Sequence, residues 1–296
     1  MTRKLPQIAF LGIGLMGTPM TRNLLDAGFP MTLWNRTASK CEPFASEATV
    51  ADTPADAVRS ADVVITMLEN SDIVEQVMIA SGAMAAMKPG ALVIDMSSIQ
   101  PSVARRHAAL AAEKGVGYVD APVSGGTLGA QEARLSIMAG GSEEDVLRAR
   151  PIFEVLGKCT RIGPVGAGQL AKLANQAIVG ITIGAVSEAL LLAARGGADP
   201  AAVREALMGG FAGSRILELH GQRMIDRDFA PGAPARIQLK DLRMILDEAR
   251  AEGLTLPLSQ QVHNGYLSLV ANGHSDADHS GLLLELEHIN GTRLGA

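Results

Sequence analysis

The sequence predicts an α/β fold in which a doubly wound parallel sheet is followed by a second, all-helical domain. Short apolar runs alternate with helical segments through the first half of the chain, at residues 8–11, 31–34, 63–67, 92–95 and 118–119. This alternation is typical of βαβ units whose helices cover both faces of a parallel sheet. A second small pair of strands follows, with residues 135–139 as its clearest strand, and the strand pattern stops at Gly163-Pro164. A chain of 296 residues exceeds the usual size of one core, so two domains are expected, residues 1–164 and 165–296.

The first strand leads into a glycine-rich turn, GIGLMG at residues 12–17, and then into a helix. In the GxGxxG pattern of a Rossmann-type domain, Gly12 makes the tight turn, Gly14 lets the backbone approach a pyrophosphate, and Gly17 permits close packing. Amides at the helix start would hold the anion. Three glycines can also serve a turn alone, but their place after the first strand favours a dinucleotide site that includes Leu15 and Met16.

The second strand ends in Asn35-Arg36-Thr37. Enzymes that use NAD usually place an acidic side chain here, against the ribose 2′-hydroxyl. No carboxylate is present, and an arginine can pair with a 2′-phosphate, so the sequence favours NADP while leaving NAD possible. The alternative is that Arg36 is an ordinary solvated loop residue.

A long helix is expected from residue 169 to 195, because apolar residues recur at helical spacing and Gly196-Gly197 supplies a stop. The helix is apolar on most sides. Such a helix usually packs within a bundle or against another subunit, so a homodimer or homotetramer is expected.

Lys172 lies in the first turn of this helix and is the candidate general acid/base. The positive end of the helix macrodipole and partial burial both disfavour its charge, which suits proton transfer to an alkoxide. Asn175 and Gln176 follow at i+3 and i+4, on the same helix face, where they could hold a substrate. A solvated lysine with two capping amides is the equally weighted alternative. The six histidines are scattered, and most are interpreted as surface or capping residues.

A second candidate substrate element is DAPVSGG at residues 120–126, a turn at the carboxyl end of a strand. Ser124, Gly125 and Gly126 would expose a hydroxyl and successive backbone amides, which can capture a carboxylate. The alternative is a plain connecting loop. Residues 95–98, DMSS, end a central strand where ligands bind in open α/β sheets.

Composition excludes several classes of partner. The net charge of -5 gives no basic field for nucleic acid. Cys41 and Cys159 are far apart, so neither a disulfide framework nor a metal site is expected. The polar start runs straight into a strand, which is unlike a signal peptide, and the apolar stretch 177–186 falls short of a membrane span. We therefore expect a cytoplasmic protein with no membrane partner and a small carboxylate substrate.

Five ordered segments, 12–17, 95–98, 120–126, 166–176 and 240–242, together resemble the β-hydroxyacid dehydrogenase family over nearly the whole chain. The resemblance implies an NAD(P)-dependent enzyme with its active site in the cleft between the two domains. It also implies that Lys172 is catalytic, that Ser124, Gly125 and Gly126 bind the substrate carboxylate, and that Asn175 assists. By the same resemblance, Ser98 and Lys240 approach the cofactor, and Met67 and Leu68 line its ribose side.

Within that family Gln176 resembles the branch of 2-hydroxy-3-oxopropionate (tartronate semialdehyde) reductase, as do residues 210–214, 226–229 and 278–280. The residues at 35–37 are more like those of 6-phosphogluconate dehydrogenase. The resemblance thus implies NADP-dependent reduction of a small aldehyde-acid. Two alternatives stay open: oxidation of a 3-hydroxyisobutyrate-type acid, and a non-catalytic NADP-binding module.

Overall fold

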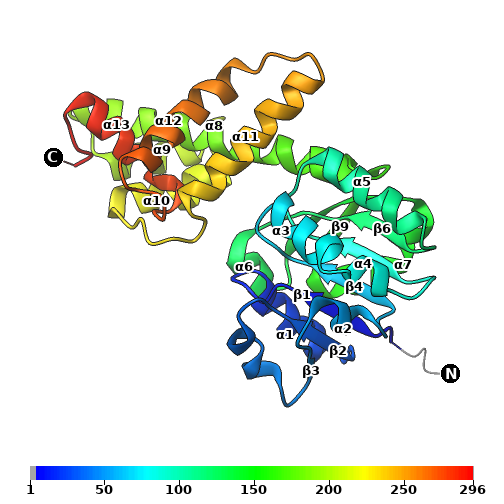
Figure 1. The fold of residues 1–296 in the computed structure, drawn as a ribbon. Coiled ribbons are helices and arrows are strands. Elements are labelled where there is room, and N and C mark those ends of the chain that lie inside the picture. Colours follow the sequence, from blue (N-terminus) through cyan, green and yellow to red (C-terminus); the bar gives the residue numbers. More distant parts are fainter. Residues whose placement is uncertain (1–4, 296) are drawn as a thin grey trace. The chain divides into compact units, whose positions relative to one another are not determined.

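A computed structural model describes residues 5–295, which divide into two compact units (Figure 1). The first, called here the sheet unit, ends at Lys172, and the second, the helical unit, begins at Leu173. The division therefore falls inside the long helix α8 (Ala167–Arg195), eight residues later than the sequence suggested. The reason is that the first turn of α8 packs on the sheet: a Cβ on Gly168 would lie 2.6 Å from the carbonyl oxygen of Asp120.

The sheet unit contains nine strands in the order β3-β2-β1-β4-β5-β6-β8-β7, with β9 paired to β8. Their bounds are β1 (Ile8–Leu11), β2 (Met31–Trp34), β3 (Thr49–Val50), β4 (Val63–Thr66), β5 (Leu92–Asp95), β6 (Gly117–Asp120), β7 (Val123–Ser124), β8 (Leu135–Gly140) and β9 (Gly157–Gly163). The pairs from β3 to β6 are parallel, whereas β8 runs antiparallel to β6 and β7. The strand order reverses between β1 and β4. Open α/β sheets bind ligands at the carboxyl ends of the strands at such a point.

Successive residues of β1 enter different cores, one on each face of the sheet. Ile8 and Phe10 pack in a core with α1 (Gly17–Asp26) and α7 (Glu143–Leu156). Ala9 and Leu11 pack in the other, with α2 (Pro54–Val58), α4 (Ala83–Ala86) and α5 (Pro101–Ala112). Smaller helical segments are α3 (Ser71–Glu75), α6 (Gly126–Gln131) and the 3-10 or π turns η1 (Ala38–Lys40), η2 (Glu42–Phe44) and η3 (Gln76–Ala80). The doubly wound fold expected from the sequence is confirmed.

The helical unit is formed by most of α8, α9 (Pro200–Met208), α10 (Arg215–Asp226), α11 (Ala235–Ala251), α12 (Pro257–Ala271), η4 (His279–Gly281) and α13 (Leu282–Asn290). α8 is longer than the apolar stretch noted in the sequence, and by length and composition alone it could cross a membrane. Buried core helices share those properties. Ile183 and Leu190 of α8 are fully buried against Tyr266 and Leu283, so this helix forms part of the core of the unit.

Candidate active site

The glycine turn lies between the ends of β1 and β4, where the strand order reverses. Gly12 has a φ of +112°, and a Cβ there would collide with the carbonyl oxygen of Met67. A Cβ on Gly17 would collide with the carbonyl oxygen of Gly12, whereas a Cβ on Gly14 would meet nothing within 4 Å. Two glycines are thus required by packing, and the third borders open space. Because α1 has no acidic residue in its first turn and no side-chain cap, its first amides suit an anion such as a pyrophosphate.

The residues after β2 divide into a structural one and an exposed one. Asn35 accepts a hydrogen bond from the Ile13 N–H at 3.0 Å and donates one to the Thr37 carbonyl oxygen at 2.9 Å, which ties the glycine turn to the end of β2. Arg36 is exposed, and within residues 5–295 no hydrogen bond or ion pair engages its guanidinium. Its side chain is therefore available to a phosphate group beside the turn.

The loops that follow β4 and β5 are locked to each other. Leu68 donates its N–H to Ser97 Oγ at 2.9 Å, and Ser97 donates its own N–H to Asp95 Oδ1 at 3.0 Å. A Cβ on Gly12 would also lie 2.9 Å from Leu68 Cδ2. The structure therefore brings Met67 and Leu68 against the glycine turn, with half-buried Ser98 next to the residue that links the two loops.

The turn after β7 has the backbone needed to present amides. Gly125 and Gly126 have φ angles of +132° and +63°, in the region that other residues rarely adopt. Ser124, the last residue of β7, is half-buried, and a Cβ on Gly126 would face open space. The open space beside Gly126 leaves room for the small anionic group that the sequence predicts here.

The start of α8 is bound to the ends of β5 and β6 by Asp120 and Gln169, neither of which was a predicted site residue. Asp120 accepts hydrogen bonds from the N–H groups of Gly166 at 2.7 Å and Gln169 at 2.8 Å. The Gln169 side chain donates to the Ser97 carbonyl oxygen at 2.8 Å and accepts from the Ile99 N–H at 3.1 Å. Lys172, half-buried, follows one turn later. Burial raises the pKa of Asp120 to about 7, although the two N–H donors counteract part of that rise.

In the helical unit the predicted site residues are joined through a buried carboxylate on α11. Asn175 donates to Gln176 Oε1 at 2.8 Å, and Gln176 donates to Asp241 Oδ2 at 2.6 Å. Lys240 Nζ lies 3.1 Å from Asp241 Oδ1. Gln176, which was expected to help hold the substrate, accepts the Asn175 side-chain N–H and donates to Asp241 in the helical unit. Asp241 was missed because nothing local to α11 reveals its partner on α8.

Most of the six histidines were expected to be surface or capping residues, and two of them are buried. His107 is fully buried, with Nε2 lying 2.7 Å from Glu75 Oε2. His279 is also buried, and its Nε2 lies 3.1 Å from the Nε2 of His220. These partners come from other elements, so the residues around each histidine in the sequence carry no sign of them.

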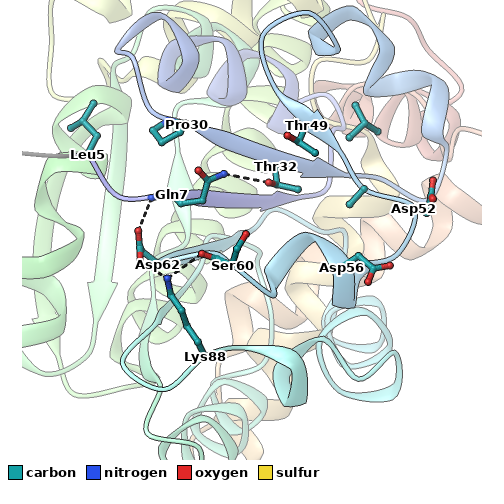
Figure 2. A pocket seen from close by; sticks show the side chains of 12 residues that line it. Leu5, Gln7, Pro30, Thr32, Thr49, Asp52, Asp56, Ser60, Asp62 and Lys88 are labelled. Atoms are coloured by element: carbon teal, nitrogen blue, oxygen red, sulfur yellow. Dashed lines mark hydrogen bonds and ion pairs between the residues drawn. The ribbon is translucent and has the colours of Figure 1, made fainter.

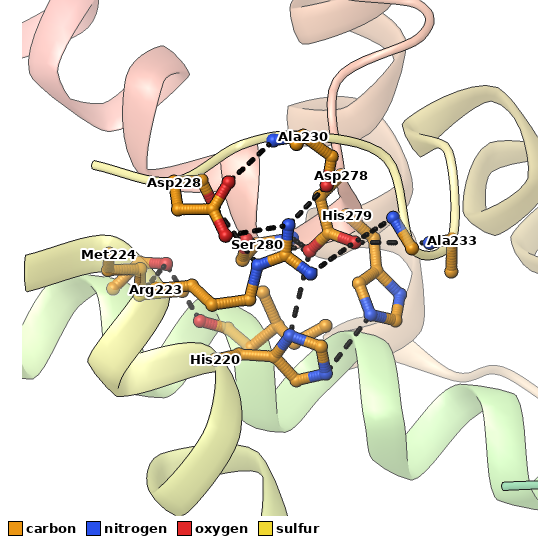
Figure 3. A network of polar contacts seen from close by, with 12 residues as sticks. His220, Arg223, Met224, Asp228, Ala230, Ala233, Asp278, His279 and Ser280 are labelled. Carbon is orange, nitrogen blue, oxygen red and sulfur yellow. Dashed lines mark hydrogen bonds and ion pairs between the residues drawn. The ribbon is translucent and has the colours of Figure 1, made fainter. Parts of the chain in front are cut away.

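His220, Asp278 and His279 form a polar network between α10 and η4 (Figure 3). Asp278 accepts from the N–H groups of Gly232 and Ala233, each at 3.1 Å, and from Ser280. Arg223 Nη1 lies 3.5 Å from the same carboxylate. Because donors and a guanidinium already surround Asp278, the network suits holding the preceding loop to η4 better than binding a cation.

This network predicts an acid-sensitive stability. Burial lowers the pKa of His279 from its usual 6.5 to about 4, so between these values the unfolded chain binds a proton that the fold does not. The stability due to neutral His279 is therefore present at pH 7 and lost as the pH falls. Between pH 7 and pH 5 the wild type should therefore lose about 2 kcal/mol more of its unfolding free energy than His279→Gln does. Urea denaturation of both proteins measures this difference, and the exposed His274→Gln should not show it.

In the sheet unit, a cavity of about 720 Å³ lies at the amino ends of the strands, opposite to the glycine turn (Figure 2). Gln7, Pro30 and Asp62, which directly precede β1, β2 and β4, line it, and Lys88 Nζ lies 2.6 Å from Asp62 Oδ1. Since α/β sheets bind cofactors at the carboxyl ends of their strands, this cavity is not the dinucleotide site.

The strand order and a glycine turn at the point of reversal define the sheet unit as a dinucleotide-binding domain. Residues 7–163 match the family model of the NAD binding domain of 6-phosphogluconate dehydrogenase. Residues 166–286 match a second family model, described as NAD-binding of NADP-dependent 3-hydroxyisobutyrate dehydrogenase. The chain belongs to the β-hydroxyacid dehydrogenase family, as its sequence motifs predicted.

Full-length relatives support the same assignment. The chain is 44% identical to 2-hydroxy-3-oxopropionate reductase of Escherichia coli K12, over 95% of this chain and 97% of that protein. It is 40% identical to a probable 3-hydroxyisobutyrate dehydrogenase-like protein of Arabidopsis thaliana, over 96% of this chain and 86% of that protein. The solved structure of Mycobacterium tuberculosis 3-hydroxyisobutyrate dehydrogenase with L-serine has a TM-score of 0.87 and 34% identity, covering 95% of this chain and 99% of that one.

Proposed function

We propose that this enzyme uses NADPH to reduce a small aldehyde-acid, such as 2-hydroxy-3-oxopropionate, to the hydroxy acid. The observation that carries this proposal is the 44% identity to the Escherichia coli reductase over nearly the full length of both chains. The positive-φ turn at Gly125 and Gly126 adds a place for the carboxylate that such a substrate carries.

In this proposal the chain holds the substrate and moves one proton. Ser124 and the amides after it bind the carboxylate, and Asn175, oriented by Gln176, assists in holding the reacting oxygen. NADPH, when bound, supplies the hydride. The Lys172 ammonium donates its proton to the carbonyl oxygen as that oxygen gains negative charge, which avoids a free alkoxide.

A second candidate is the reverse reaction, oxidation of a 3-hydroxyisobutyrate-type acid. It is supported by the names of several relatives and by the 34% identity to the Mycobacterium tuberculosis enzyme. The same groups would act in the opposite sense, with neutral Lys172 accepting the hydroxyl proton. Only the favoured substrate and direction differ between the two candidates.

A substrate panel distinguishes them. The purified protein would be assayed with NADPH and NADH against 2-hydroxy-3-oxopropionate, succinic semialdehyde, methylmalonate semialdehyde and glyoxylate, and in reverse with glycerate and 3-hydroxyisobutyrate. The highest kcat/KM is expected with 2-hydroxy-3-oxopropionate and NADPH. A preference for 3-hydroxyisobutyrate would select the second candidate, and NADPH binding without turnover of any acid would support the non-catalytic module.

Arg36 provides the test of cofactor preference. Arg36→Asp should weaken NADPH binding by about 1.5 to 3 kcal/mol, the usual value of a charge-assisted hydrogen bond, and leave NADH binding unchanged. Fluorescence titration of both cofactors measures the two dissociation constants. Arg59→Asp, which makes the same charge change at another exposed site, should have little effect on either cofactor. Equal losses for NADPH and NADH in Arg36→Asp would mean that Arg36 has a structural role.

We also propose that the enzyme is a soluble, cytoplasmic homodimer or homotetramer that associates through α8. Leu170, Ile178 and Leu192 are three large apolar side chains of this helix, and they are 40%, 67% and 76% exposed. A second copy would cover them. Light scattering after size exclusion should show a dimer or tetramer, and Ile178→Glu with Leu192→Glu should shift it toward the monomer.

A further inference from the structure

We infer that Asp120 and Gln169 are positioning residues that fix Lys172 relative to the cofactor loops. The inference rests on the proposed role of Lys172 as general acid. Neither residue is assigned a part in the reaction: they act through the backbone of α8 and through the loop after β5.

Asp120 fixes where α8 begins. Its two carboxylate oxygens bind different N–H groups, Oδ1 that of Gly166 and Oδ2 that of Gln169. Gly166 directly precedes α8 and Gln169 lies in its first turn, where N–H groups lack partners within the helix. A carboxylate that bridges two such groups prevents the helix start from sliding along β6. Charge-assisted bonds of this kind are about twice as strong as neutral ones.

Gln169 fixes the rotation of the same turn. Its side chain donates to the Ser97 carbonyl oxygen and accepts from the Ile99 N–H, and the residue is 1% exposed. Rotation of α8 about its axis would break both bonds. Since Lys172 is three residues further on, its direction from the helix is set by this anchor.

The anchor reaches the loops beside the glycine turn. Ser97, whose carbonyl oxygen Gln169 binds, also accepts the Leu68 N–H through its hydroxyl. Leu68 in turn lies against Gly12. Two hydrogen bonds and one packing contact therefore join the cofactor turn to the helix that carries the proposed proton donor. Hydride and proton transfer need both groups to be held within fractions of an ångström.

Packing removes the space for another arrangement. A Cβ on Gly140 would lie 2.5 Å from Asp120 Oδ1 and 2.7 Å from the Gly168 nitrogen. The backbone of α8 thus lies directly on β6 and β8, with the carboxylate between them. Burial disfavours the charged form and raises the pKa of Asp120, and within the sheet unit the two N–H bonds offset part of that cost.

Two variants test the inference. Asp120→Asn replaces one acceptor by an NH₂ group that would face an N–H donor, and Gln169→Met removes both side-chain bonds at similar volume. Each should lower kcat by about 10-fold or more, the scale of misplacing a catalytic group by a fraction of an ångström. The NADPH dissociation constant should change less than about twofold, because the glycine turn is intact. If Asp120→Asn does not fold, Gln169→Met decides the question.

Glu287→Gln is the matched control. Glu287 is a buried carboxylate in the helical unit that binds Arg227 and the Leu294 N–H. The Glu287→Gln variant should unfold at a lower temperature than the wild type but have the wild-type kcat at temperatures below that transition. A kcat loss in this control equal to that of the two variants would mean that they act through stability alone, and the inference would be wrong.

Lys172→Ala, measured in parallel, separates the inference from the proposed function. If Lys172→Ala is inactive while Asp120→Asn and Gln169→Met turn over at the wild-type rate, the positioning role is overturned and the proposed function stands. If Lys172→Ala retains turnover, the proton-donor role of Lys172 fails and the positioning role fails with it, while the reduction itself stands. Loss of kcat in all three variants, with NADPH binding retained, is the expected result.

Discussion

Replacing Lys172 with alanine is expected to lower kcat by a factor of about 10² to 10⁴, the range contributed by a positioned general acid. Without the ammonium, the substrate oxygen would receive its proton from water while it gains charge. The dissociation constant of NADPH should stay close to that of the wild type, since the glycine turn and Arg36 are untouched. Single-turnover kinetics with NADPH and 2-hydroxy-3-oxopropionate, together with a cofactor titration, measure both quantities.

Two further variants define what the lysine does. Lys172→Arg keeps a positive charge that does not dissociate near neutral pH, so it should also be slow if proton transfer matters, and near normal if charge alone suffices. Lys158→Ala removes an exposed lysine from β9 in the same unit and should leave kcat unchanged. A Lys172→Ala enzyme that keeps more than a tenth of the wild-type kcat would contradict the assignment.

Most of the sheet could be predicted because its central strands are buried on both faces. β1, β2 and β5 have the bounds that their apolar runs suggested, and β4 and β6 differ by one residue or two at their ends. β3 and β7 were missed since each is only two residues long. β9, GKCTRIG, was missed because it lies at the side of β8 and is mostly exposed, so it has no apolar alternation.

The cofactor turn was visible in the sequence because its chemistry is local: three glycines at fixed spacing between a strand and a helix. The anchors of the candidate catalytic helix were not visible, because Asp120 binds N–H groups 46 and 49 residues away. Asp241 and Gln176 are 65 residues apart. Nothing near an aspartate in the sequence shows which distant backbone it will meet, so such partners appear only with the tertiary structure.

The final prediction separates the two uses of glycine in the turn. Gly17→Ala places a methyl group against the carbonyl oxygen of Gly12, so the turn or α1 must shift. The expected cost is about 1 to 3 kcal/mol of unfolding free energy, as for other overpacked sites. Gly14→Ala meets nothing within 4 Å and has no positive φ, so its unfolding free energy should match that of the wild type.

The affinity for NADPH should depend on Gly14, although the unfolding free energy does not. The open space beside it is where the proposed pyrophosphate approaches the first amides of α1, and a methyl group would stand between them. Gly14→Ala should therefore weaken NADPH and NADH binding alike, by about 10-fold or more, since a lost charge-assisted hydrogen bond costs about 1.5 to 3 kcal/mol. Urea denaturation and cofactor titration of the same samples give both quantities. Wild-type affinity in a stably folded Gly14→Ala protein would show that the pyrophosphate lies elsewhere. A loss of cofactor affinity in Gly14→Ala without a loss of unfolding free energy assigns Gly14 to binding and Gly17 to folding.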